Sequence, residues 1–320
     1  MTKVLVTGAN GFVGRALCAG LVARGVQVRG SIRHLCELPA GVEPVVVGEI
    51  DENTNWQGAL DECEVVVHLA ARVHVMHESA KNPLEEFRRV NVVGAEHLMR
   101  SASSAGVKRF VYVSSIKVNG EETLGTESYS ELDQPAPQDP YGISKWEAEQ
   151  ALHHIAKETG LEVVIVRPPL VYGAGVKGNF LQMMNIVARH LPLPLARIKD
   201  QRDLIYVGNL VDALITCATH PDAAGQTYLV SDGKSVSTPD LIRNLAKALD
   251  SRCFLLPFPV FIMKFLAKLM GKSSTVDRLT QSLRIDSSKI HKELAWQPPY
   301  TMEEGLKATA DWYLREKQEK

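Results

Sequence analysis

The run VLVTGANGFVG near the start of the chain constrains the fold more than any other segment. Its apolar beginning predicts a buried strand over residues 3–6, and the apolar periodicity after it predicts a helix over about 11–24. In such a unit Gly8 allows the tight turn, Gly11 lets the backbone approach a pyrophosphate, and Gly14 lets helix and strand pack closely. The helix N-terminus adds unpaired N–H groups and the positive end of a dipole. The motif therefore predicts a dinucleotide-binding unit.

The rest of the first half alternates between strands and helices, which predicts an α/β fold of the Rossmann type, a doubly wound parallel sheet with helices on both faces. The expected strands are 3–6, 26–32, 44–47, 64–69, 109–114 and 162–166, and the clearest helices are 85–105 and 141–159. Beyond Arg167 prolines and glycines become frequent. We therefore expect a dinucleotide-binding domain over 1–167 and a smaller mixed α/β substrate lobe over 168–320, with a segment near 204–218 returning to the main domain.

The composition argues against several classes of function. The net charge of the 320 residues is −1, which implies no surface for nucleic acid. The five cysteines are scattered without a Cys-x-x-Cys, which fits a reducing, cytoplasmic compartment and neither disulfides nor a metal site. No apolar run is long and uncharged enough to span a membrane. The nearest, 254–270, fits a helix packed on the second lobe better than a basic amphipathic helix lying on a membrane surface.

A second group of residues has the chemistry of proton transfer. Asp139 and Pro140 suit the start of a helix, which puts Tyr141 and Lys145 on one face, four residues apart. At about 4 Å and an effective dielectric of about 20, the ammonium would stabilise a phenolate by about 4 kcal/mol, or about three pKa units. Tyr141 would then titrate near neutral pH, where an acid/base catalyst works best. Ser115 ends an apolar strand, where a doubly wound sheet binds its ligands.

Several motifs follow one another along the chain: Gly8-x-x-Gly11-x-x-Gly14, His68-Leu69-Ala70-Ala71, Asn91-Val92-x-Gly94, Ser114-Ser115, Tyr141-x-x-x-Lys145, Arg167-Pro168 and Arg202-Asp203-Leu204-Ile205-Tyr206-Val207. In this order they resemble the extended short-chain dehydrogenase/reductases that modify nucleotide sugars, over nearly the whole chain. The resemblance implies that Ser115 hydrogen-bonds the reacting sugar oxygen, that Tyr141 gives or takes its proton, and that Lys145 holds the nicotinamide ribose.

The resemblance also implies which residues bind the cofactor and the substrate. The cofactor residues would be Gly8, Asn10, Gly11, Phe12, Val13, Gly14, Arg33, Leu69, Ala70, Ala71, Asn91, Ser114, Tyr141, Lys145 and Pro168. The residues for a UDP-sugar would be Ser115, Lys117, Asn179, Arg202 and Arg278, with a surface arginine as the equal alternative for Arg278. A homodimer is also implied, through helices 85–105 and 141–159, with apolar surface from Val90, Val93, Leu98, Ala148 and Ala151.

The residues after Ser114 narrow the reaction. Dehydratases of this family carry Thr-Asp-Glu where this chain has Ser115-Ile116-Lys117, and elimination across carbons 5 and 6 needs a carboxylate base and a carboxylic acid. Ile116 and Lys117 supply neither, so we expect chemistry at carbon 4 of the sugar. A non-catalytic NAD(P)-binding protein is a distant alternative, since such members typically lose the tyrosine or the lysine that this chain keeps.

The end of the second strand bears on the cofactor. NAD-using members usually carry an aspartate at the position of Ile32, whereas here Ile32 is apolar and Arg33, which could accept a 2′-phosphate, follows it. This favours NADPH, with NAD as the alternative. We therefore favour a UDP-4-keto-6-deoxy-(N-acetyl)hexose 4-reductase of surface polysaccharide synthesis. The alternative is a 4-epimerase of UDP-glucose or UDP-N-acetylglucosamine, which recycles one tightly held NAD.

Overall fold

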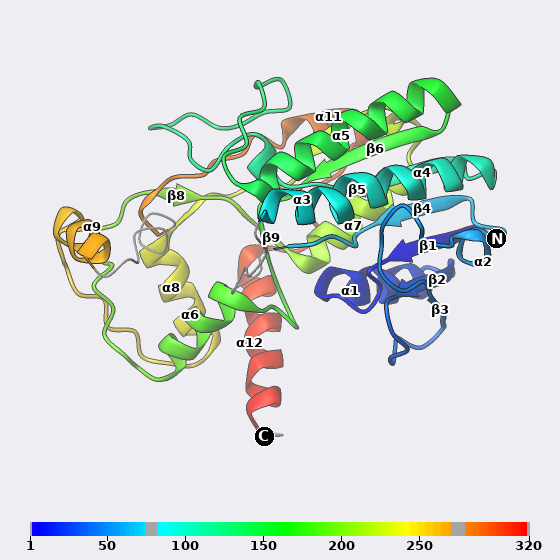
Figure 1. The fold of residues 1–320 in the computed structure, drawn as a ribbon. Helices are drawn as coiled ribbons and strands as arrows, with labels where there is room; N and C mark the ends of the chain where they lie inside the picture. Colours follow the sequence, from blue (N-terminus) through cyan, green and yellow to red (C-terminus); the bar gives the residue numbers. More distant parts are fainter. Residues whose placement is uncertain (1, 74–81, 270–278, 319–320) are drawn as a thin grey trace.

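The computed structural model describes residues 2–73, 82–269 and 279–318. Its centre is a parallel sheet of seven strands in the order β10-β6-β5-β4-β1-β2-β3 (Figure 1). The bounds are β1 Lys3–Thr7, β2 Gln27–Ile32, β3 Val42–Val46, β4 Val65–His68, β5 Arg109–Val113, β6 Glu162–Arg167 and β10 Thr227–Leu229. This is the predicted Rossmann-type fold, and six of the strands lie close to their predicted limits.

The seventh strand, β10, was not predicted. It pairs in parallel with β6, Thr227 beside Ile165 and Leu229 beside Arg167. Three residues are too short for a recognisable alternation, so this strand exists because the edge of β6 offers it hydrogen bonds. The sheet is thus completed by chain that lies beyond residue 167.

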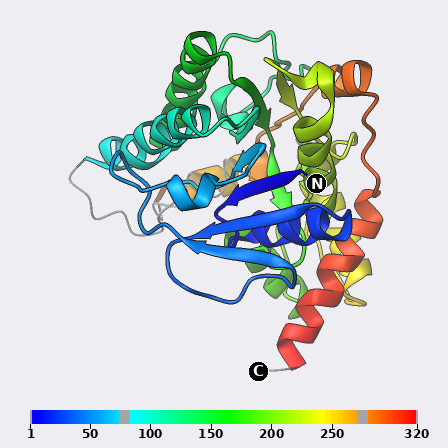
Figure 2. The ribbon, with the colours of Figure 1, turned by 90° about the vertical axis from the view of Figure 1, so that its right-hand side faces the viewer.

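Helices cover both faces of the sheet, as Figure 1 and the turned view in Figure 2 show. On one face α1 (Phe12–Ala23) packs beside α7 (Val207–Thr219), and both bury apolar side chains against the strands. On the other face α4 (Gly94–Ser104) and α5 (Pro140–Thr159) enclose a second core that includes Leu98, Phe110 and Leu152. Full burial of one such side chain contributes about 1.5–3 kcal/mol.

The predicted helix 85–105 is in fact three consecutive segments: α3 (Pro83–Arg88), a π-helical turn at Arg89–Val93, and α4. The burial of these segments corrects part of the dimer prediction. Leu98 and Ala148 are fully buried within the single chain, because both face the second core, so they offer no surface to another subunit. Val93 is 38% exposed, and Val90 and Ala151 are half-buried. The dimer itself stays a prediction.

The smaller lobe contains α6 (Gly178–Ala188), α8 (Thr238–Ala248) and α12 (Met302–Gln318), which share one apolar core. Two short strand pairs accompany them, β7 (Leu170–Tyr172) with β9 (Leu204–Tyr206) and β8 (Gln201–Arg202) with β11 (Val236–Ser237). Helix α9 (Val260–Leu269) lies at the outer end of this lobe, away from the sheet (Figure 1), and α11 (Ser288–Leu294) precedes α12. The division of the chain at residue 167 remains a proposal.

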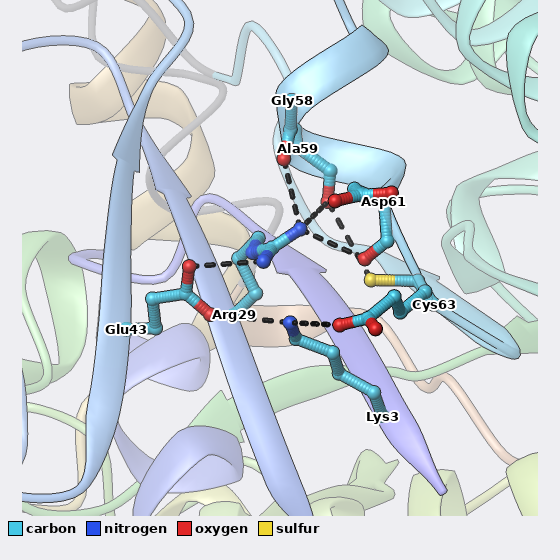
Figure 3. Close-up of polar contacts among 8 residues, drawn as sticks. Lys3, Arg29, Glu43, Gly58, Ala59, Asp61 and Cys63 are labelled. Carbon is cyan, nitrogen blue, oxygen red and sulfur yellow. Dashed lines mark hydrogen bonds and ion pairs between the residues drawn. The ribbon is translucent and has the colours of Figure 1, made fainter.

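A buried arginine of β2 lies between β3 and the short helix before β4 (Figure 3). The guanidinium of Arg29 in β2 donates to the carbonyls of Gly58 and Asp61 at 2.8 and 2.9 Å, and to the carboxylate of Glu43 at 2.9 Å. Burial alone would lower the pKa of Arg29, but the hydrogen bond and charge of Glu43 outweigh it and raise the pKa. Arg29 thereby holds the short helix α2 (Gln57–Leu60) and the segment after it against the sheet.

Candidate active site

The glycine turn after β1 has the geometry that its sequence predicts. Gly8 has φ +65°, a conformation that residues with a Cβ rarely adopt. The amide of Gly11 donates to the carbonyl of Gly8 at 2.9 Å and closes the turn. A Cβ on Gly14 would lie 2.1 Å from the carbonyl oxygen of Gly8, so only glycine lets α1 begin this close to the strand.

The start of α1 fits the pyrophosphate of a dinucleotide. Gly11 is the N-cap and supplies no side-chain hydrogen bond, and the first turn contains no acidic residue. The first N–H groups, those of Phe12, Val13 and Gly14, therefore have no capping side chain to satisfy them and no carboxylate to repel an anion. Asn10 and Gly11 are exposed, so the turn is accessible from solvent.

Thr7, which was not among the predicted site residues, joins this turn to the segment after β4. Oγ1 of Thr7 accepts hydrogen bonds from the amides of Leu69 and Ala70, both at 3.1 Å, and lies 2.7 Å from Nδ1 of His68. Because both of its lone pairs are used, the hydroxyl donates to Nδ1, and the proton of the neutral ring lies on Nε2. Burial, with a smaller effect of the Lys145 charge, lowers the pKa of His68 to about 3. His68 is therefore a neutral structural residue that orders the backbone of Leu69 and Ala70.

Asn91 is buried at the centre of a polar network. Its amide oxygen accepts from the backbone N–H of Arg72 at 2.8 Å, and its amide nitrogen donates to the Arg72 carbonyl and to Oγ of Ser144, both at 3.0 Å. The π-helical turn places the side chain there, since it widens the helix at this residue. Asn91 thus links the segment after β4 to the helix that carries Tyr141.

Helix α5 presents Tyr141 next to Ser115. The N-cap Asp139 accepts from the amide of Gly142 at 2.7 Å, and Pro140 begins the helix, as the sequence predicts. Burial raises the pKa of Tyr141 well above its usual value; the charge of Asp139 adds to this, and a hydrogen bond with the Ser115 side chain opposes it. Ser115 follows β5 and caps the 3₁₀ turn Ile116–Val118. The structure therefore brings the predicted serine and tyrosine together at the carboxyl edge of the sheet.

The expected effect of Lys145 on Tyr141 is wrong for the protein in this state. The Lys145 amine donates to the carbonyl of Val113 at 2.8 Å and to the phenol oxygen of Tyr112 at 3.2 Å. It lies 5.9 Å from the ring centre of Tyr141, compared with 4.4 Å from that of Tyr112. Burial lowers the pKa of Lys145 to about 7, partly opposed by Glu149. A half-protonated amine beside a different phenol does not bring the pKa of Tyr141 to neutrality.

The two residues after Ser115 supply no carboxyl group. Ile116 is buried in a small apolar cluster with Leu229, Leu283 and Ile285. The amine of Lys117, which the sequence assigns to the substrate, is ion-paired with Asp139 and lies 3.2 Å from Glu121. Lys117 therefore neutralises the N-cap carboxylate of the helix that carries Tyr141.

The proposed cofactor-selecting arginine has a partner. Nε of Arg33 lies 3.3 Å from a carboxylate oxygen of Glu49, which follows β3, and both side chains are more than half exposed. Ile32 is buried, as expected for the end of a central strand. Sequence reasoning missed Glu49, because no local pattern marks a pair that forms between neighbouring strand ends.

The remaining predicted residues lie partly near this edge and partly in the smaller lobe. Pro168 accepts from the amide of Ile116 at 3.0 Å, whereas the buried Oγ of Ser114 has no hydrogen-bond partner in the described chain. Ala71 follows Ala70 and is half-buried. Asn179 is exposed in the first turn of α6, and Arg202 in β8 donates to the carbonyl of Gln281 at 3.3 Å. Arg278 lies outside the described residues.

A surface hollow of about 440 Å³ opens beside β8. It is lined by residues 122–126, 199–201, 280–282, Lys264 and Arg284. It shows where the loop after Ser115 meets the smaller lobe.

Comparisons with known proteins agree with this geometry. A model described as the NAD dependent epimerase/dehydratase family matches residues 4–231. A UDP-glucose 4-epimerase of Vibrio cholerae is 45% identical over 315 residues, which cover 98% of this chain and 96% of that protein.

Solved structures show the same architecture. MoeE5 in complex with UDP-glucose and NAD is 26% identical, with a TM-score of 0.78 over 98% of this chain and 99% of that one. A UDP-glucose 4-epimerase from Thermotoga maritima with UDP-glucose is 23% identical, with a TM-score of 0.77 over 98% and 99%. At that identity the second likeness concerns the fold alone.

Proposed function

This chain belongs to the NAD dependent epimerase/dehydratase family and is an enzyme, and from that premise we propose that it is a UDP-hexose 4-epimerase. The observation that carries the proposal is the paired Ser115 and Tyr141 at the sheet edge, followed by a buried Ile116 and an ion-paired Lys117. One hydroxyl acid/base pair suits the reversible oxidation of a single carbinol, and the two following positions hold no carboxylate for elimination. The 45% identical relative, a UDP-glucose 4-epimerase, supports the same choice over the reductase that the sequence favoured.

The roles of the residues follow from their positions. Bound NAD supplies the hydride acceptor for carbon 4. Tyr141 takes the proton of the 4-hydroxyl during oxidation and gives it back during reduction, while Ser115 hydrogen-bonds the same oxygen. Hydride returned by the cofactor to the opposite face of the 4-keto sugar would invert carbon 4. Because burial keeps Tyr141 neutral in this state, the phenol must lose its proton before it can accept that of the 4-hydroxyl.

The pair of Arg33 and Glu49 supports NAD as the cofactor. A 2′-phosphate at the end of β2 would have to displace the Glu49 carboxylate from Arg33 and remain close to its charge. A ribose hydroxyl instead can donate to a carboxylate. Assignment of these residues to the cofactor is part of the proposal, as are the roles of Lys145 at the ribose and of Asn179 and Arg202 at the substrate diphosphate.

A second candidate, an NADPH-dependent 4-keto reductase, is favoured by one observation. The end of β2 carries no carboxylate, and Arg33 is 60% exposed in an ion pair with an exposed partner. Such a pair contributes only about 0–1 kcal/mol, so a phosphate could break it. The NADPH preference thus stays a prediction tied to this candidate.

Two reactions separate the candidates. The enzyme is supplied with UDP-glucose and NAD, or with UDP-4-keto-6-deoxy-N-acetylglucosamine and NADPH, and the sugars are identified by NMR. The epimerase forms UDP-galactose in the first reaction without net NADH. Reduction of the keto sugar with stoichiometric loss of NADPH, and no epimerisation, would replace the epimerase with the reductase.

A homodimer completes the proposed function. The exposed Val93 and the half-buried Val90 and Ala151 lie on the helices that cover one face of the sheet. Light scattering at micromolar concentration should give twice the mass of the chain, and the mass of one chain would exclude the dimer.

A further inference from the structure

Helix α9 exposes an aromatic and basic stripe. Phe261, Lys264, Phe265 and Lys268 have the spacing i, i+3, i+4, i+7, which places them on one face of the helix. All four are exposed, with Phe261 at 74% and Phe265 at 61%. The opposite side of the helix is anchored, because Met263 is buried in the core of the smaller lobe. The orientation of the stripe is therefore fixed by packing.

Two neighbouring loops extend this stripe. The amide of Leu193 donates to the carbonyl of Phe254 at 2.8 Å, and the amide of Leu256 donates back to Leu193 at 2.8 Å. The loops expose Leu191, Phe254 and Leu256 by 48–51%. Within the described residues, the exposed phenylalanines of the chain are the three that lie here. We call the surface formed by α9 and these loops the outer face, with Leu191, Phe254, Leu256, Phe261 and Phe265 as its apolar members.

The outer face is also strongly basic. Segments 189–200 and 252–268 carry six exposed cations: Arg189, Arg197, Lys199, Arg252, Lys264 and Lys268. None of the six forms an ion pair with any other described residue. Asp200 is the one carboxylate in the two segments, so their net charge is +5 in a chain whose total is −1. The outer face thus has a net positive charge in a chain that is almost neutral overall.

We propose that the outer face docks this enzyme on an anionic phospholipid bilayer. Lysines that alternate with exposed phenylalanines suit the boundary between headgroups and acyl chains: the rings enter the boundary, and the amines meet lipid phosphates. Among the described residues no helix is long and apolar enough to cross a bilayer, so the attachment is peripheral. A symmetric contact with a second copy would place a charge of +5 against an identical charge, which disfavours that occupant.

The position of the outer face is compatible with docking during catalysis. Figure 1 shows α9 at the end of the smaller lobe that lies farthest from the seven-stranded sheet. Lys264 also lines the hollow beside β8, so the docked surface would lie next to that hollow. The inference concerns location and does not depend on which carbon-4 reaction the enzyme catalyses.

Vesicle sedimentation tests the proposal. The full-length protein is mixed with vesicles of phosphatidylcholine and phosphatidylglycerol in a 3:1 ratio, or of phosphatidylcholine alone, at low and high salt. We expect binding to the anionic vesicles only, weakened by salt because screening shortens the reach of the lysines. Lys264→Gln with Lys268→Gln should weaken binding by about fivefold per lysine. Phe261→Ser with Phe265→Ser should weaken binding by about tenfold per ring, because each ring loses part of the free energy gained when a phenylalanine is buried.

Matched controls keep the result interpretable. Leu132→Ser removes a side chain that is 95% exposed elsewhere, and Lys307→Gln removes an exposed lysine of α12; neither should change sedimentation. Circular dichroism and the thermal midpoint show that each variant is folded. Absence of binding to anionic vesicles, equal binding to both vesicle types, or unchanged binding of the phenylalanine variant would overturn the proposal. If the wild-type protein binds no vesicles and the phenylalanine variant has the mass of one chain where wild type has that of two, the outer face would be assigned to a second copy of the chain.

Discussion

The amine of Lys145 lies 3.2 Å from the phenol oxygen of Tyr112 but 5.9 Å from the ring centre of Tyr141. The sequence spacing of Tyr141 and Lys145 guarantees a shared helical face but not a direct contact. Tyr112 on β5 and the carbonyl of Val113 offer the amine its hydrogen bonds instead. The pKa of the buried Lys145 amine should therefore be visible in how the free energy of unfolding depends on pH.

Stability should rise with pH from about 7 to 8.5 because of Lys145. Its pKa is about 7 in the folded protein and 10.5 for the same amine in the unfolded chain, so in this range the unfolded chain binds a proton that the folded chain does not. The slope from this group is at most about 1.4 kcal/mol per pH unit. Urea unfolding of wild type and Lys145→Met at four pH values isolates it, because all other groups are shared. Parallel pH profiles for the two proteins would contradict the lowered pKa.

Tyr141→Phe should reduce turnover by about a hundredfold or more, the usual effect of a lost acid/base group. The ring and its edge contact with Phe87 are kept, so the protein should fold and bind nucleotide normally. Steady-state kinetics and calorimetric binding of UDP give the two readouts. Activity close to wild type in the folded variant would remove Tyr141 from the mechanism.

Lys117→Met should make the basic form of Tyr141 harder to reach. The charge of Asp139 raises the pKa of Tyr141, and Lys117 is the cation paired with Asp139. Without Lys117 the pKa of Tyr141 should rise further. At a fixed pH the population of the phenolate falls about tenfold for every 1.4 kcal/mol by which the phenolate is destabilised. The pH profile of kcat, which should move to higher pH, is the measurement. Lys157→Met, an exposed lysine near the other end of α5, is the control and should leave the profile in place.

The pair of Arg33 and Glu49 should decide the cofactor. If the enzyme uses NAD, wild type binds NADH more tightly than NADPH, and Glu49→Gln raises the NADPH affinity about tenfold because Arg33 becomes free. Arg33→Ala should then leave NADH binding almost unchanged. Wild type that prefers NADPH, with about ten- to a hundredfold of that preference lost in Arg33→Ala, would establish the NADPH candidate instead.

Arg29→Met should lower the free energy of unfolding by about 2–4 kcal/mol, since the carbonyls of Gly58 and Asp61 lose their donor and Glu43 keeps only Lys3 as a partner among the described residues. Arg100→Met breaks an ion pair with Glu158 in which both side chains are more than 40% exposed, and should cost less than about 1 kcal/mol. Chemical denaturation gives both values. Equal decreases in the free energy of unfolding for the two variants would show that burial does not increase the contribution of Arg29 to stability.

The parts that the sequence predicted are those in which local pattern and final structure coincide. The glycine turn requires Gly8 and Gly14 whatever surrounds it, and Asp139-Pro140 begins a helix because of local sequence preference alone. The alternation of apolar strands with helices likewise identified the parallel sheet, because each unit must bury its own apolar face.

The parts that were missed are set by neighbours distant in sequence. Glu49 meets Arg33 because adjacent strands end together, and Tyr112 takes the Lys145 amine because β5 lies under α5. Leu98 was assigned to a subunit interface although it packs inside one chain. The apolar pattern of a helix is the same whether its own chain or another subunit covers it. Thr7 was overlooked because one hydroxyl that orders two amides has no periodic signature.

The pairing of β10 with β6 has a consequence for how the protein is made. A ribosome must deliver about sixty residues after β6 before the last strand of the sheet exists, and α7, which covers one face, arrives only shortly before it. Until then β6 is an open edge beside uncovered apolar surface, the condition under which nascent chains pair with one another. Chaperone demand during synthesis should therefore peak between residues 167 and 230, and a fragment that stops at 167 should aggregate rather than fold.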